Sequence, residues 1–195
     1  MWILSLEWLA LALLVFWVIG AFKRLKRLRA GSKQAFAAVE TQFTQVIELL
    51  RNSARVQTLK ERVSNFSLQH AHLALLPSAD LLEAALKQAQ QHPLRPEAIT
   101  ALDTSWQGAQ VAWLAYVELA SAQAEGQDAH VQEQAERWQQ LMTLQSHSTA
   151  QFNAAVQDYN RAIAQFPASM VARLGGLKAG RIFQKDAALL MQPSA

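Results

Sequence analysis

The sequence predicts an all-α protein: an N-terminal transmembrane helix followed by an antiparallel up-down bundle of three to four long helical arms. Three observations lead to this fold class. An apolar run opens the chain, a cluster of cations follows it, and beyond the cluster apolar residues recur at spacings of three and four. Helix-forming residues dominate the 195-residue chain, of which 51% is apolar and 17% charged. Without its anchor, the chain has the size of one domain.

The opening apolar run extends from Trp2 to Phe22 and is interrupted only by Ser5 and Glu7. A helix of about twenty such residues crosses a bilayer. Aromatic residues lie near both ends of the run, where interfacial side chains gather. A cleaved signal peptide is the alternative, but its positive charges would precede the run, whereas here they follow it. We therefore predict a transmembrane helix over residues 1–22.

A basic juxtamembrane segment is expected over residues 23–33. Six of the eighteen lysines and arginines lie in it: Lys23, Arg24, Lys26, Arg27, Arg29 and Lys33. Residues 34–195 carry twelve basic and fourteen acidic side chains, so the rest of the chain is not basic. The first five cations therefore predict contact with anionic lipid headgroups rather than with nucleic acid. Because positive segments stay inside, the following domain is expected in the cytoplasm.

The helical bundle domain is predicted over residues 34–166. Its clearest helix alternates steps of four and three from Val131 to Phe166, a coiled-coil pattern of five heptads. Asp128 is expected to cap this helix and Pro167 to end it. The polar residues Gln145 and Thr149 interrupt the apolar seam, which is typical of positions that specify register.

Two further arms precede that helix. One begins at Pro96, a residue suited to the first helical position, and its apolar face carries Ile99, Leu102, Trp106, Ala109, Trp113, Tyr116 and Ala120. The other runs from Gly31-Ser32, where a bend is expected, to about Leu75. Pro77 is predicted to break the chain there, and Ser78 to cap a shorter helix over residues 79–91. Helices with one apolar stripe each are stable only when packed together.

Residues 152–183, near the carboxyl end, contain a pattern of residues that resembles a known family. The pair Phe152-Asn153 is followed by Ala-Val, by Tyr159-Asn160, by an isoleucine, by Phe166-Pro167 and by Gly176-Leu177-Lys178. Over residues 152–183 this pattern resembles the signature of the LemA family, whose members also have an N-terminal anchor and long helices. The family-signature positions are Phe152, Asn153, Tyr159, Asn160, Phe166, Pro167, Gly176 and Lys178. The resemblance implies a helical bundle at the bacterial inner membrane and no assigned reaction.

The signature residues also have structural interpretations. Tyr159 and Phe166 fall on the heptad seam and are expected in the core, with the tyrosine hydroxyl reaching a polar edge. Asn153 and Asn160 are seven residues apart, hence on one helical face. We expect interhelical hydrogen bonds from them, and binding of a partner is the alternative.

The carboxy-terminal segment and tail, residues 167–195, mix basic and apolar residues. Arg173, Lys178 and Arg181 are interspersed with apolar side chains, which is typical of a short amphipathic helix. Gly175-Gly176 and Gly180 favour a loop that folds back along the bundle instead. A docked end-cap and a surface for partners or headgroups are both compatible with this composition.

Residues with recognisable chemistry are few. The chain has no cysteine, and its five histidines lack the spacing of metal ligands, so no metal or cofactor is expected. A glycine-rich phosphate loop, a nucleophile elbow and a carboxylate pair within an apolar stripe are all absent from the sequence. The chain is therefore predicted not to be an enzyme, with no catalytic residues.

Two non-catalytic functions remain from this reasoning. The first is a membrane-anchored scaffold at the inner membrane whose partners are other membrane or cytoplasmic proteins. The second is a protein that responds to lipid charge or envelope stress through its basic segment and carboxy-terminal segment. Uncovered helical faces also allow a homo-oligomer.

Overall fold

Five α-helices make up the described part of the chain, and no strand occurs in it. The structure is a computed structural model that describes residues 2–60, 66–123, 129–166 and 168–184, without the side chains of 2–7, 10, 56–60, 66–70, 72 and 123. The helices are α1 (Trp2–Lys60), α2 (Phe66–Gln91), α3 (Pro96–Gln123), α4 (Ala129–Ala164) and α5 (Ala168–Leu174). The prediction of an all-helical protein is confirmed.

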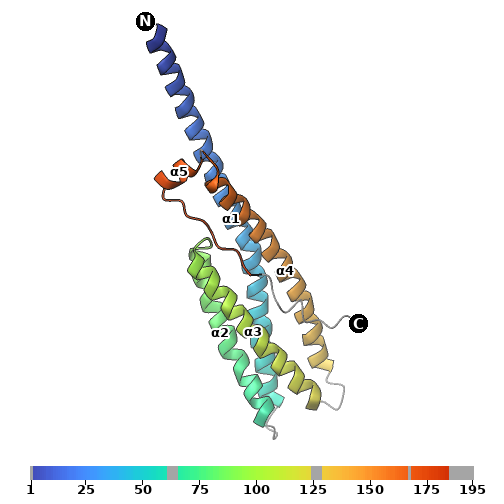
Figure 1. The fold of residues 1–195 in the computed structure, drawn as a ribbon. Coiled ribbons are helices and arrows are strands. Elements are labelled where there is room, and N and C mark those ends of the chain that lie inside the picture. The colour runs from blue at the N-terminus through green and yellow to red at the C-terminus, as the bar shows by residue number, and fades with distance from the viewer. Residues whose placement is uncertain (1, 61–65, 124–128, 167, 185–195) are drawn as a thin grey trace.

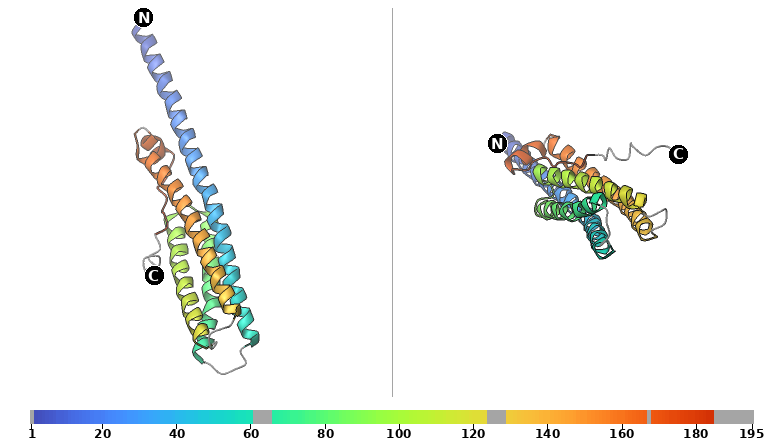
Figure 2. Two further views of the ribbon diagram at one scale, coloured as in Figure 1. Left: turned by 90° about the vertical axis from the view of Figure 1, so that its right-hand side faces the viewer. Right: turned by 90° about the horizontal axis from the view of Figure 1, so that it is seen from below.

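Each long helix runs antiparallel to the one before it in the chain, as Figure 1 shows. α1 packs along α4, and the hairpin of α2 and α3 packs against this pair chiefly through α2. The N-terminal part of α1 extends beyond the other helices, and α5 lies against it where it leaves the bundle (Figures 1 and 2). After α5 the chain turns back and runs along the bundle without regular secondary structure.

A hydrogen bond joins α1 to α4 at the buried Ser32. α1 continues through Gly31-Ser32, and the fully buried hydroxyl of Ser32 donates to the carbonyl of Leu28 in its own helix and to that of Ala155 in α4, at 3.1 Å each. A hydroxyl that bonds to a backbone carbonyl of a neighbouring helix requires the two backbones to approach closely. The small residues that predicted a bend therefore provide the contact point of the two longest helices.

The expected break at Pro77 is wrong. Pro77 lies inside α2, which begins at Phe66 and continues to Gln91. Proline removes one backbone donor from a helix. The hydroxyl of Ser78 donates to the carbonyl of Leu75 at 2.8 Å, so Ser78 bonds backward within the helix and does not cap a new one. Tertiary packing of the buried residues Leu75, Ala79 and Leu82 keeps the helix continuous.

Stacked aromatic rings form the centre of the core. The indole of Trp138 on α4 lies between those of Trp106 and Trp113 on α3, with ring centroids 5.7 and 4.7 Å away. Phe43 of α1 meets Trp106 edge-on at 5.4 Å. The predicted apolar face of α3 is confirmed in full, because Ile99, Leu102, Trp106, Ala109, Trp113, Tyr116 and Ala120 are all buried.

Some polar side-chain atoms are buried in the bundle without a hydrogen-bond partner. Within the described residues, the side-chain oxygens of Gln42 and Gln145 and the indole nitrogen of Trp106 are buried without a hydrogen-bond partner. The amide nitrogen of Gln145 donates to Thr149 at 3.0 Å. Unsatisfied buried groups cost stability, so the core is less stable at each of these positions than it would be with a satisfied or apolar side chain.

The seam predicted on α4 holds except at its end. Phe152, Val156 and Tyr159 are buried, whereas Phe166 is 77% exposed. The helix ends at Ala164, so Phe166 lies beyond the last turn, where its ring contacts Trp17 at 6.1 Å. The expected core position of Phe166 is therefore wrong.

The predicted transmembrane helix over residues 1–22 is also corrected. Among the side chains that the structure describes, no helix combines the length and the apolar character needed to cross a membrane. The side chains of residues 1–7 and 10, which belong to the predicted span, lie outside the described part. The inner-membrane location and the lipid partner depended on that helix and are corrected with it.

The stacked core yields a stability prediction. Replacing Trp138→Ala should lower the free energy of unfolding by about 3–5 kcal/mol, because the substitution removes a ring packed against two others and leaves a cavity. Urea unfolding followed by circular dichroism measures the change. The matched control on the same helix is Leu144→Ala, whose side chain is 51% exposed and whose loss should cost less than about 0.5 kcal/mol. Equal losses in the two variants would contradict this assignment of the core.

Candidate functional site

A cavity of about 740 Å³ opens between α1, the turn that joins α2 to α3, α4 and the segment after α5. Its volume lies in the range of small-molecule sites. The lining residues are Arg29, Lys33, Gln88, Gln91, His92, Pro93, Leu94, Arg95, Pro96, Glu97, Tyr159, Gly176, Lys178 and Ala179. The cavity therefore draws its side chains from segments that are far apart in the sequence.

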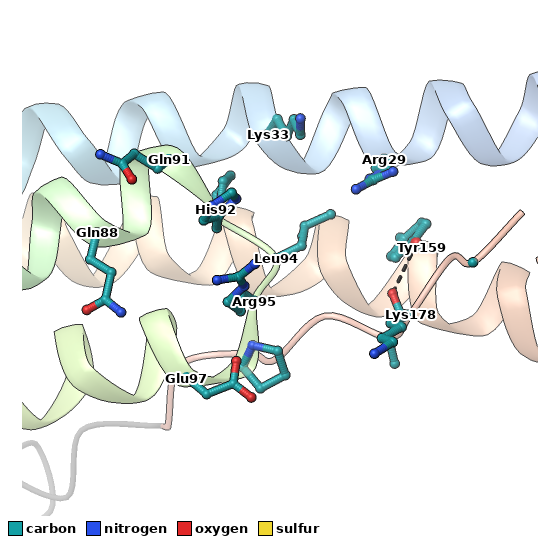
Figure 3. Close-up of a pocket in the computed structure, with 14 residues that line it drawn as sticks. Arg29, Lys33, Gln88, Gln91, His92, Leu94, Arg95, Glu97, Tyr159 and Lys178 are labelled. Carbon is teal, nitrogen blue, oxygen red and sulfur yellow. Dashed lines mark hydrogen bonds between the residues drawn. The ribbon is translucent and has the colours of Figure 1, made fainter.

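Four cations dominate the lining. Arg29 and Lys33 are one helical turn apart on α1, while Arg95 comes from the α2–α3 turn and Lys178 from the segment after α5 (Figure 3). None of the four forms an ion pair with a carboxylate of the described residues. Glu97 is the single carboxylate among the lining residues. The cavity consequently has an excess of positive charge that suits an anionic ligand.

The α2–α3 turn owes its shape to its two prolines and two backbone hydrogen bonds. The amide of His92 donates to the carbonyl of Ala89 at 3.2 Å, and the amide of Arg95 donates to the carbonyl of His92 at 2.9 Å. Pro93 is buried, and Pro96 begins α3. This tight connection fixes the backbone at Arg95 and Glu97 next to the cavity.

A Schellman motif ends α5 and directs the chain toward the cavity. The amide of Leu177 donates to the carbonyl of Ala172 at 2.9 Å, and that of Gly176 donates to Arg173 at 3.3 Å. Gly176 has a φ of 62°, the left-handed conformation that this motif requires and that glycine adopts without strain. The chain then continues as an extended segment, residues 177–184, which we call the strap.

Two asparagines of α4 hold the strap by its backbone. The side-chain amide of Asn160 donates to the carbonyl of Gly180 at 2.8 Å and accepts from its amide at 2.9 Å. Asn153 makes the same pair of bonds to Phe183, at 3.1 and 2.8 Å. Each asparagine thus pairs with one residue of the strap as a neighbouring peptide would. The predicted interhelical hydrogen bonds of these asparagines are replaced by bonds to the strap.

Apolar contacts also hold the strap at the two residues that the asparagines bond, Phe183 and Gly180. Phe183 is buried against Phe43 and Phe152, with ring centroids 6.3 and 5.5 Å away. At Gly180 an added Cβ would lie 3.1 Å from side-chain atoms of both Leu94 and Val156, so a larger residue would require these side chains to shift by a few tenths of an ångström. The strap is therefore wedged between the α2–α3 turn and α4.

Asp103 of α3 forms the last contact of the strap. Its buried carboxylate accepts a hydrogen bond from the amide of Gln184 and lies near Arg181. Burial raises the pKa of Asp103, and these two contacts oppose the rise. The strap thus joins α3 to α4.

Tyr159 links the strap to the cavity. Its hydroxyl donates to the carbonyl of Lys178 at 3.1 Å, the bond drawn in Figure 3. Burial raises the pKa of Tyr159, an effect that the nearby Arg29 opposes. The phenol therefore stays protonated and remains a donor at neutral pH. The predicted polar contact of its hydroxyl is confirmed.

The residues singled out in the sequence are only partly brought together. Of the basic segment, Arg29 lines the cationic cavity and Arg24 lines a smaller apolar cavity of about 280 Å³ beside α5, while Lys23, Lys26 and Arg27 are exposed elsewhere on α1. Most of the signature residues gather around the strap, namely Phe152, Asn153, Tyr159, Asn160, Gly176 and Lys178. Pro167 lies outside the described residues.

Sequence reasoning missed the contribution of the α2–α3 turn. The segment His92-Pro93-Leu94-Arg95-Pro96 predicted only an interruption between helices, yet His92 and Arg95 line the cavity. Lys33 was counted within the basic segment but was not assigned a site. The available signal was a short proline-rich turn with basic residues between two apolar helices. In the described part of the chain, no group of three His, Asp or Glu residues is placed to hold a metal ion.

The fold and the cavity define a class of protein: a helical bundle with a cationic site of small-molecule size. A family model for isopentenyl transferases matches residues 7–140, more than two-thirds of the chain. The chain belongs to the isopentenyl transferase family. No curated protein and no solved structure matches it.

This membership overturns several predictions from the sequence. The chain is not identified as a LemA protein, and the expectation that it is not an enzyme is wrong, because isopentenyl transferases are enzymes. The membrane scaffold and the lipid- or stress-responsive protein are corrected for the same reason. The resemblance to LemA rested on residues 152–183, whereas the family match ends before this segment.

The matched residues contain most of the cavity. Ten of its fourteen lining residues lie within residues 7–140, including Arg29, Lys33 and Arg95. The sequence has no glycine-rich phosphate loop, whose backbone amides hold phosphates in many nucleotide enzymes. Phosphate recognition at this cavity would therefore depend on side-chain cations.

Burial of Asp103 gives a pH prediction. The folded state binds the proton of this carboxyl more tightly than the unfolded chain, whose pKa is near the ordinary value of 3.8. As pH rises from there through the raised pKa, the unfolded chain has released a proton that the folded chain keeps, so the wild-type protein loses stability. Asp103→Asn cannot ionise and should not show this loss.

Urea unfolding at about pH 3.5 and about pH 7 measures the difference. The urea concentration at the unfolding midpoint is compared between Asp103→Asn and the wild-type protein at each pH. The value for the variant minus the value for the wild-type protein should be larger at about pH 7 than at about pH 3.5. Asp80→Asn is the matched control at an exposed carboxylate. A difference that stays constant or decreases with pH would contradict the assigned cost of burying Asp103.

Proposed function

We propose that the chain binds a phosphorylated isopentenyl donor in the cationic cavity and transfers its five-carbon group to an acceptor. The observation that carries this proposal is the convergence of Arg29, Lys33, Arg95 and Lys178, without ion-pair partners in the described residues, on a cavity of about 740 Å³. Family membership supplies the chemistry. A diphosphate is the leaving group that best matches four nearby cations.

Charge stabilisation is the main task of such a site. When the bond between the isopentenyl carbon and the ester oxygen breaks, its electron pair leaves with the diphosphate, whose negative charge increases. Arginine and lysine placed around that group stabilise the charge as it develops. Arg29 and Arg95 offer paired donors suited to phosphate oxygens, while Lys33 and Lys178 act as point charges.

Other lining residues suit the remaining parts of the reaction. Pro93 and Leu94 provide the apolar surface that a five-carbon chain needs beside the cations. As the acceptor's nucleophilic atom forms a bond to the isopentenyl carbon, it loses a proton. Glu97 is the lining carboxylate that can accept this proton, and His92 is the lining imidazole.

The first test is the binding of inorganic diphosphate, measured by isothermal titration calorimetry at low salt. Arg29→Ala should weaken binding about tenfold, because it removes one charge-assisted contact. Arg27→Ala is the matched control: it removes the same charge two residues away on α1, outside the cavity lining, and should change affinity less than about twofold. Affinity should fall as salt is added.

Transfer is tested next with an allylic five-carbon diphosphate labelled in its carbon chain. Diphosphate release that depends on an added acceptor, and that decreases in Glu97→Gln, supports the proposal. A wild-type protein that binds no diphosphate at millimolar concentration would overturn it. So would an equal loss of affinity in Arg29→Ala and Arg27→Ala, since that would show only a general effect of net charge.

A further inference from the structure

We propose that Asn160 is a positioning residue for the anion site, acting through the strap to hold Lys178 at the cavity. The inference rests on the proposed function, because it concerns the same site. It assigns to Asn160 a role in ligand binding although its side chain is not among the residues that line the cavity.

The geometry places Asn160 in control of the backbone next to Lys178. Its amide pairs with both backbone groups of Gly180, two residues after Lys178. Its neighbour Tyr159 donates to the carbonyl of Lys178 itself. The backbone on the carboxyl side of Lys178 is thus fixed to α4 at two points, while Lys178 itself is exposed, lines the cavity and forms no ion pair with the described residues.

Only asparagine fits this arrangement. An aspartate cannot donate to the carbonyl of Gly180, a glutamine is one methylene longer, and a leucine of similar shape makes neither bond. The space beside Gly180 is narrow, since an added Cβ would lie 3.1 Å from the side chains of Leu94 and Val156, which limits movement of the strap there. A change at Asn160 should therefore free the strap at Gly180 rather than be absorbed locally.

Docking of the strap on the bundle and binding of an anion in the cavity are thermodynamically coupled. An anion that contacts Lys178 on the strap and Arg29 or Lys33 on α1 binds the docked strap more tightly than a released one. The anion must then stabilise docking, and docking must strengthen anion binding by the same factor. Since three cations lie off the strap, its release should weaken binding and not abolish it.

Asn153 provides a matched control within the same helix. It forms two bonds of the same kind to the strap, but at Phe183, five residues from Lys178. If the asparagines served only to close the bundle, both substitutions would have the same effect on ligand binding. If Asn160 positions Lys178, the two should differ.

The experiment measures inorganic diphosphate binding to the full chain by calorimetry for Asn160→Ala, Lys178→Ala, the double variant and Asn153→Ala. We expect about tenfold weaker binding for Lys178→Ala, at least about fivefold for Asn160→Ala and less than about twofold for Asn153→Ala. The double variant should bind no more weakly than Lys178→Ala, because Asn160 acts through that lysine. Circular dichroism checks that each variant is folded.

The outcomes separate this inference from the function on which it rests. If the wild-type protein binds no diphosphate, the proposed function fails and the inference with it. If the wild-type protein binds but Asn160→Ala binds equally well, or if the losses of Asn160→Ala and Lys178→Ala multiply in the double variant, only the positioning role is overturned. Should Asn160→Ala not fold, Asn160→Leu keeps a similar shape but makes neither bond to Gly180 and should weaken binding at least about threefold, whereas unchanged binding would contradict the role.

Discussion

The close antiparallel packing of α1 on α4 is the contact on which the other parts of the structure depend. It is fixed where Ser32 bonds across to Ala155, and from that point the register sets every other pairing. Phe36 meets Phe152 on one side, and on the same stretch of α1 the cations Arg29 and Lys33 come to lie near Tyr159. α4 in turn presents the two asparagines that hold the strap. A shift of one helical turn would separate the cations of α1 from the backbone that carries Lys178.

Helical periodicity predicted the bundle well where packing follows local pattern. The buried face of α3 and most of the seam of α4 are as the spacing of apolar residues indicates. Errors arose where tertiary contacts or chain ends decide, as at Pro77, which packing retains within α2, and at Phe166, which lies just beyond the last turn of α4. The apolar start of α1 was interpreted by its composition alone, and the carboxy-terminal signature by resemblance, and neither supported the function inferred from it.

The cationic cavity could not be derived from sequence, because its charges are far apart along the chain. Arg29 and Lys33 stood among similar residues in one basic segment, and nothing local distinguished them from Arg27. Arg95 lay in a turn noted only for its prolines. Lys178 is placed at the cavity by the left-handed conformation of Gly176 and by the bonds of Asn153 and Asn160 to the strap backbone. These features do not produce a periodic pattern in the sequence. Such a site becomes visible only when the register of the helices is known.

The strap also determines the order in which the molecule can assemble. Helices form from contacts within a few residues, whereas Phe183 meets Phe43 across a loop of about 140 residues, whose closure is slow and entropically costly. The strap has no regular structure that could form before the helices it bonds to are in place. The bonds of the strap can therefore form only once α3 and α4 are packed. Because the strap contains no helix, far-ultraviolet circular dichroism reports on the bundle and does not report on whether the strap closes the cavity.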